Sequence, residues 1–96
     1  MESVYENALA IELEKRGLKV ARQVDVSIEY DGKEVGKHRL DLVVEDTIVV
    51  ELKATKSFED IHFAVVKSYL KAAGRKHGLL VNFAKTTLQV KRVIYE

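Results

Sequence analysis

The first segment with a helical repeat of apolar residues covers residues 3–16. Apolar side chains recur there at intervals of four positions, the spacing of one buried helix face. They are Tyr5, Leu9 and Leu13. Ser3 and Glu6 have the S-x-x-E spacing of a capping box, and Gly17 can end a helix in the left-handed conformation. The pattern predicts a helix with one face against a core.

A second helical segment covers residues 59–73 and is followed by Gly74. Its predicted core stripe consists of Ile61, Ala64, Val65, Ser68 and Ala72. His62 lies on a broader apolar face, which favours a buried, hydrogen-bonded histidine; a contact to phosphate or to a site carboxylate is the alternative. Tyr69 is expected in the core with its hydroxyl bonded, and a place at the functional site is the second interpretation.

Alternating apolar and polar residues predict three consecutive strands. The first covers residues 18–30 and the second residues 33–44, with Asp31-Gly32 between them as a two-residue hairpin turn. A turn at residues 45–47 then leads into a third strand at residues 48–53. Two neighbouring antiparallel pairs are therefore expected.

Two further strands are expected after the second helix, at residues 77–84 and 88–94. The first is mostly apolar, as in strands buried on both faces. A helix between the third and fourth strands suggests a crossover to a parallel neighbour. The sequence thus predicts an α/β fold, a mixed sheet flanked by helices. The last strand could be a free edge that pairs across a homodimer.

An acid and a base interrupt the apolar third strand, with another acid on the second strand. Glu51 and Lys53 are two residues apart and share a face, and a three-residue loop would set Asp41 opposite Glu51. Two adjacent carboxylates repel when both are ionised, and a divalent cation removes that repulsion. The carbonyl of Leu52 could add a ligand. The alternative is an ion pair at the strand end, involving Lys53 or Arg39.

Basic residues follow the exposed side of the second helix and the turn after it. They are Lys67, Lys71, Arg75 and Lys76. They predict either a solvated helix face or a stripe that contacts nucleic-acid phosphates.

Composition limits these hypotheses without deciding between them. The 96 residues carry 16 Lys plus Arg against 15 Asp plus Glu, a net charge of +1, which neither demands nor excludes nucleic acid. The length predicts a single domain over residues 1–96. No Cys is present, which excludes disulfides and thiolate metal sites. No apolar run reaches the ~18 residues of a membrane span, so a soluble cytoplasmic protein is expected.

Several segments together resemble the PD-(D/E)XK nuclease superfamily, and more closely its GxxExxY family. The core of the resemblance is Leu40–Val44 followed by Ile48–Ala54. The other matching segments are Glu2–Glu6, Arg16–Leu18, Arg22–Val24, Tyr30–Gly32, His62 with Tyr69-Leu70, and Gly78–Phe83. The resemblance covers essentially the whole chain.

The resemblance implies a restriction-endonuclease-like αβββαβ core and phosphodiester hydrolysis that depends on Mg²⁺ or Mn²⁺. By position, Asp41 and Glu51 would be metal ligands, Lys53 the catalytic lysine and Glu2 an accessory carboxylate. The family usually has a Gln four residues before the tyrosine of the second helix, where this chain has Val65.

The sequence is therefore compatible with three functions. The first is a metal-dependent nuclease that cuts DNA or RNA. The second is a catalytically degenerate module that binds nucleic acid or a protein. The third is a self-associating structural protein.

Overall fold

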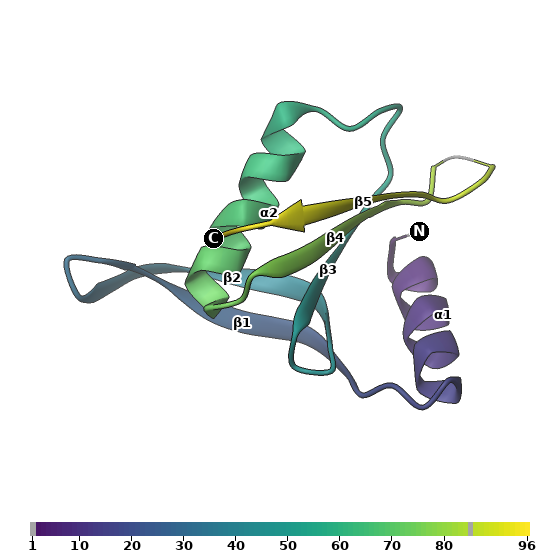
Figure 1. The fold of residues 1–96 in the computed structure, drawn as a ribbon, viewed down its shortest axis with the longest axis horizontal. Helices are drawn as coiled ribbons and strands as arrows, with labels where there is room; N and C mark the ends of the chain where they lie inside the picture. The colour runs from purple at the N-terminus through teal and green to yellow at the C-terminus, as the bar shows by residue number, and fades with distance from the viewer. Residues whose placement is uncertain (1, 85) are drawn as a thin grey trace.

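Two helices pack against opposite faces of one mixed sheet (Figure 1). The computed structural model describes residues 2–84 and 86–96. The elements are α1 (Glu2–Lys15), β1 (Val20–Tyr30), β2 (Lys33–Val44), β3 (Ile48–Lys53), α2 (Asp60–Ala73), β4 (His77–Asn82) and β5 (Gln89–Ile94). The strands lie in the order β1-β2-β3-β4-β5, with β3 and β4 parallel and the other neighbours antiparallel. The predicted α/β architecture is confirmed.

The sheet has a separate apolar core on each face. The core under α1 contains Ala10, Leu42, Val44, Val50, Leu52, Val81 and Phe83. The core under α2 contains Leu40, Val43, Val49, Val66, Leu70, Leu80 and Val93. β3 contributes to both cores through alternate residues, as a central strand does. Within residues 2–84 and 86–96, no helix is long and apolar enough to span a bilayer.

The start of α1 differs from the prediction. The helix already includes Ser3, so Ser3 does not cap it. Glu6 is buried and accepts hydrogen bonds from Arg22 and Gln23 of β1, so the capping-box interpretation is wrong. The contact with β1 is favoured over a capping box because two β1 donors satisfy the buried carboxylate. The end of the helix is as predicted, since Gly17 has a φ of 85°.

The buried face of α2 also differs from the prediction. Val66 and Leu70 are fully buried, with Phe63 and Ala73 beside them, whereas Ile61 is 61% exposed. The helix is apolar on much of its circumference, so periodicity alone did not define the core face. Gly74 ends the helix with a φ of 67°, as predicted.

His62 lies outside the apolar core, and its side chain is only half-buried. Its Nδ1 accepts a hydrogen bond of 2.8 Å from the backbone N–H of Glu59. The backbone N–H of His62 in turn donates to the carbonyl oxygen of Glu59 at 2.9 Å, which closes the first turn of α2. The interpretation of His62 as a buried core residue is wrong, because a histidine at this position can cap the helix locally.

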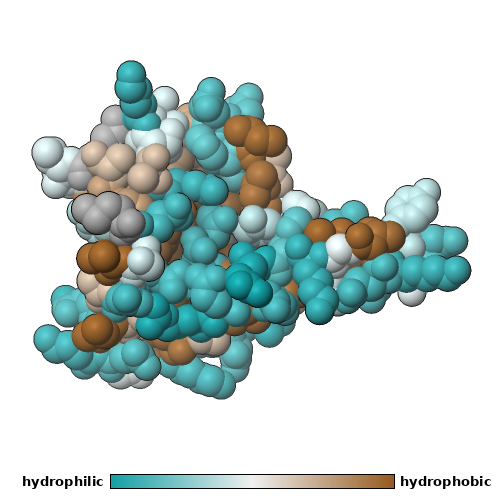
Figure 2. Space-filling view, turned by 180° about the vertical axis from the view of Figure 1, so that it is seen from behind, coloured by the Kyte–Doolittle hydropathy of each residue, from teal (hydrophilic) through white to brown (hydrophobic). Residues whose placement is uncertain are grey.

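The β1–β2 hairpin forms an arm that extends beyond the body of the molecule (Figure 1). Asp31 and Gly32 both have positive φ, 54° and 75°, the geometry of the predicted two-residue turn. Apolar side chains lie among the hydrophilic ones along the arm (Figure 2), and Tyr30 and Val35 are largely exposed. A register shift places a bulge beside Gly36, where the sequence has its only glycine within a strand of the arm.

The alternation of faces reverses at one place in β1 and β2, which we call the crease (Gln23 and Asp41). Leu40 packs in the core under α2 and Leu42 in the core under α1, although residues two apart in a strand normally share a face. Gln23 has a φ of 50° and lies across from Asp41, between two regular pairs. The crease therefore breaks the sheet pattern at Asp41 itself.

Gly78→Ala is expected to destabilise the fold by about 1–3 kcal/mol, because it overpacks the core under α2. A Cβ at Gly78 would lie 2.9 Å from Val66 Cγ1 and 3.3 Å from the carbonyl oxygen of Val49. Urea unfolding measures the loss. Gly36→Ala is the matched control, because its Cβ would meet Ile28 at an ordinary 3.6 Å. Equal stability of the two variants would contradict the prediction.

Candidate functional site

The predicted turn between β2 and β3 brings Asp41 to the end of β3. The antiparallel ladder pairs Val44 with Ile48 at one end and Leu42 with Val50 at the other. The predicted register is therefore confirmed as far as this ladder extends. One step further, the carboxylate of Asp41 accepts a 2.8 Å hydrogen bond from the backbone N–H of Leu52. A side chain here occupies a place that a backbone carbonyl would take in a regular ladder. The acid is thus fixed beside β3.

Glu51 is a buried carboxyl group whose hydrogen-bonding capacity is not satisfied. The residue is 4% exposed, and its Oε1 has no hydrogen-bond partner among the described residues. The pKa of Glu51 is raised from 4.5 to about 8, mainly by burial and then by hydrogen bonding with Asp41 and by the charge of Asp41. In the absence of a cation, this environment favours the protonated form of Glu51. An unpaired buried oxygen beside a second carboxylate fits a divalent cation, which would favour the ionised form.

Lys53 follows Glu51 on the same face of β3. Its Nζ lies 4.0 Å from Glu51 Oε2, and about a third of its side chain is exposed. Its positive charge opposes the increase in the pKa of Glu51. The ion-pair alternative is therefore realised only as this long contact. Arg39 takes no part in it, because its Nε donates to Asp25 at 3.0 Å.

Glu2 lies in the first turn of α1 and is exposed. Its charge contributes the smallest of the influences that raise the pKa of Glu51. In the part of the chain that the structure describes, no three His, Asp or Glu side chains form a group that could hold a metal ion. The structure therefore brings Asp41, Glu51 and Lys53 together, and Glu2 contributes only through its charge.

Tyr69 packs against the core under α2, as expected from the sequence, and the carboxyl groups of Glu51 and Asp41 also influence its hydroxyl. Burial raises the pKa of Tyr69, and the charges of Glu51 and Asp41 and hydrogen bonding with Glu51 raise it further. The ring of His38 packs against the ring of Tyr69 at a centroid distance of 4.4 Å. The Nε2 of His38 also lies 3.1 Å from Ser68 Oγ. The sequence held no signal for His38, because its contact depends on how α2 docks onto β2.

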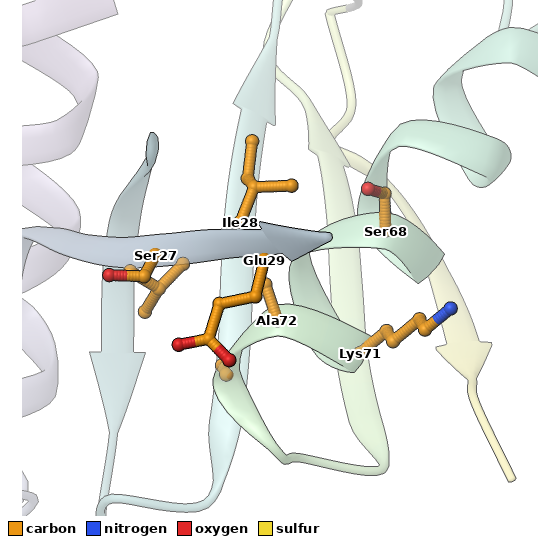
Figure 3. A pocket seen from close by; sticks show the side chains of 8 residues that line it. Ser27, Ile28, Glu29, Ser68, Lys71 and Ala72 are labelled. Atoms are coloured by element: carbon orange, nitrogen blue, oxygen red, sulfur yellow. The ribbon is translucent and has the colours of Figure 1, made fainter. Parts of the chain in front are cut away.

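The four basic residues predicted to bind nucleic acid are all exposed, as either interpretation requires. Lys71 borders a hollow of about 520 Å³ between α2 and β1 (Figure 3), and Arg75 borders a smaller one of about 140 Å³. Neither hollow is lined by a residue of the Asp41–Glu51–Lys53 site. The larger hollow also contains Glu29 of β1, a charge that would repel phosphate.

Comparison with known proteins decides the family. A family model described as the PD-(D/E)XK nuclease superfamily matches residues 1–93. The chain belongs to the PD-(D/E)XK nuclease superfamily. A search of the curated proteins found no match. Members of this superfamily are nucleases and generally use divalent metals, in keeping with the carboxylate pair.

Two solved structures have a fold similar to that of this chain. SSO0001 has a TM-score of 0.74 at 20% identity, over 97% of this chain and 49% of its own. The alkaline exonuclease LHK-Exo from Laribacter hongkongensis has a TM-score of 0.72 at 14% identity, over 98% of this chain and 56% of its own. The superfamily member described here thus spans about half the length of these proteins. The expected restriction-endonuclease-like fold is confirmed.

Proposed function

We propose that residues 1–96 form a single nuclease domain of the GxxExxY type, which hydrolyses nucleic-acid phosphodiester bonds with Mg²⁺ or Mn²⁺. The observation that carries this proposal is the unpaired, buried Oε1 of Glu51, next to Asp41 and Lys53. A buried carboxyl group left without a partner is costly unless it serves a ligand. Membership of a nuclease superfamily supports the same conclusion.

Each residue of the site has a distinct proposed role. Asp41, Glu51 and the carbonyl of Leu52 would hold the cation, with Glu2 as an accessory carboxylate. When bound, the cation would lower the pKa of a water molecule and neutralise charge on the phosphate. Lys53, at the partly exposed end of β3, would orient the attacking water and stabilise the negative charge that develops on the phosphate oxygens.

Nucleic acid is the substrate class that the comparisons favour. A second structure of the same alkaline exonuclease is a complex with dAMP and has a TM-score of 0.71 to this chain at 14% identity. A nucleoside monophosphate is the unit released by exonucleolytic cleavage of DNA. We keep Lys67, Lys71, Arg75 and Lys76 as proposed contacts to more distant phosphates, because all four are exposed.

Asp41→Asn is expected to abolish Mn²⁺ binding at millimolar metal and to stop cleavage of single-stranded and duplex oligonucleotides. The amide keeps the acceptor for Leu52 N–H but removes the charge that attracts the cation. Calorimetric titration and gel assays measure the two effects. Asp25→Asn is the matched control, because Asp25 is an exposed carboxylate that pairs with Arg39 on the arm. Failure of the wild-type protein to bind millimolar Mn²⁺ would refute the proposal.

A binding module without turnover is the second candidate, and Val65 is the observation that favours it. Val65 lies on α2 one turn before Tyr69, where the resemblance leads us to expect Gln. A valine cannot hydrogen-bond to water or phosphate near Glu51. Metal binding with both oligonucleotide substrates intact would support this candidate.

Self-association is the third candidate, and it rests on the position of β5. This strand lies at an edge of the sheet, as predicted. Lys91 and Arg92 occupy its middle and are exposed, a feature of edges that avoid pairing. Sedimentation of the protein alone measures its oligomeric state.

A further inference from the structure

Asn82 is a completely buried polar side chain at the end of β4. Its Oδ1 accepts hydrogen bonds from the backbone N–H groups of Thr55, at 3.2 Å, and Ala84, at 3.0 Å. Its Nδ2 donates to the carbonyl oxygen of Thr55 at 2.7 Å and to the side chain of Gln89 at 3.3 Å. A primary amide has two donors and two acceptor lone pairs, so all its capacity is used.

These contacts lie directly beyond the proposed catalytic lysine. Lys53 is the last residue of β3, and its partner in the parallel ladder is Asn82. The carbonyl of Lys53 accepts a 3.0 Å hydrogen bond from the backbone N–H of Phe83. Two residues later, the amide of Asn82 binds both the N–H and the C=O of Thr55. The side chain thus acts as an additional rung where the backbone ladder stops.

We propose that Asn82 is a positioning residue, which fixes the chain on the C-terminal side of Lys53 and thereby aims its side chain at the Asp41–Glu51 pair. The inference rests on the proposed role of Lys53. Lys53 is held on one side by β3 and on the other by the Thr55 contacts. Without those contacts, the chain after Lys53 would leave the sheet freely, and the Nζ would lose its defined position.

The chemistry of the amide explains why other residues would not serve. Aspartate would lose both donors and bring a negative charge against the carbonyl oxygen of Thr55. Leucine has nearly the same shape but no polar atom, so the main-chain groups of Thr55 would lose their partners. Gln89 joins β5 to the same network, which makes it a second, milder place to test the role.

Asn82→Leu is expected to lower kcat for oligonucleotide cleavage by at least about tenfold, because misplacing a reacting group by about 1 Å costs up to 10²-fold. Mn²⁺ affinity should stay within about twofold, since Asp41 and Glu51 precede the released segment. The ¹³C-methyl NMR signal of reductively methylated Lys53, assigned with Lys53→Arg, should move towards the position of a mobile lysine. Gln89→Leu should shift that signal in the same direction by less, which keeps the test available if Asn82→Leu does not fold.

Val81→Ala is the matched control, because Val81 neighbours Asn82 on β4 but packs in the core under α1. It should lower stability while leaving the Lys53 signal and kcat unchanged. An unmoved Lys53 signal in Asn82→Leu would overturn the proposal, and so would equal shifts in the control. If the wild-type protein does not cleave, the proposed function fails, and the Lys53 signal still decides whether Asn82 positions that side chain.

Discussion

Lys53→Met is expected to reduce the rate of phosphodiester cleavage by about 10²–10³-fold, the usual loss when one preorganised donor to the transition state is removed. The methionine side chain is similar in length and apolar, so packing at the end of β3 should change little. Removing a positive charge next to Glu51 should not weaken the binding of a cation. The expected signature is therefore a loss of kcat with metal affinity kept.

Single-turnover cleavage with Mn²⁺ measures the rate, and calorimetry measures metal affinity. Lys15→Met is the control, because Lys15 lies at the far end of α1 and makes only an exposed contact with Glu12. A lysine that only pairs with Glu51 as a structural ion pair would change stability and leave the rate constant alone. Full activity in Lys53→Met would remove this residue from the mechanism.

Glu51→Gln is expected to stabilise the metal-free protein at alkaline pH while abolishing metal binding. The pKa of Glu51 is raised from 4.5 to about 8, so between these values the folded chain holds a proton that the unfolded chain has released. The free energy of unfolding therefore falls as pH rises from about 4.5 to about 8 and is level above that range. At about 1.4 kcal/mol per pKa unit, the free energy of unfolding of the wild-type protein falls by an amount on the order of 3–5 kcal/mol over this range.

Urea unfolding in the presence of a chelator, from pH 4.5 to pH 9, measures this dependence. Glutamine has the same shape and no ionisable group, so the two stability curves should meet at the acid end and separate towards pH 9. Glu29→Gln serves as the control, because Glu29 is exposed on the arm and its variant should follow the wild-type curve. Parallel curves for wild type and Glu51→Gln would show that the buried carboxyl group carries no such cost.

The strands were predictable because their boundaries depend on local chemistry. Asp31-Gly32 specifies a tight hairpin, and the bounds of β2 and β3 are those expected from alternation and turns. The core face of α2 was not predictable, because apolar residues surround much of that helix. Only the way α2 packs on the sheet selects Val66 and Leu70 as its buried residues. Glu6 was misassigned for a related reason, since its partners on β1 are distant in sequence.

The candidate site was predictable in its charged centre but not in its surroundings. An acid and a base on an otherwise apolar strand indicate Glu51 and Lys53, and the short turn places Asp41 near them. Tyr69 and Asn82 reach the site only through the crossover that brings α2 and β4 into place. No local pattern distinguishes them from ordinary core residues.

The crease at Gln23 and Asp41 has a consequence for comparing this chain with its relatives. Losing one residue from each of β1 and β2 at this place would restore an unbroken alternation, and both apolar cores could still form. The same change would withdraw the carboxylate that now binds Leu52 N–H. A homologue with a regular sheet here would thus keep the fold and lose the acid, so the irregularity itself can serve as a diagnostic marker that separates site-bearing homologues from purely structural ones.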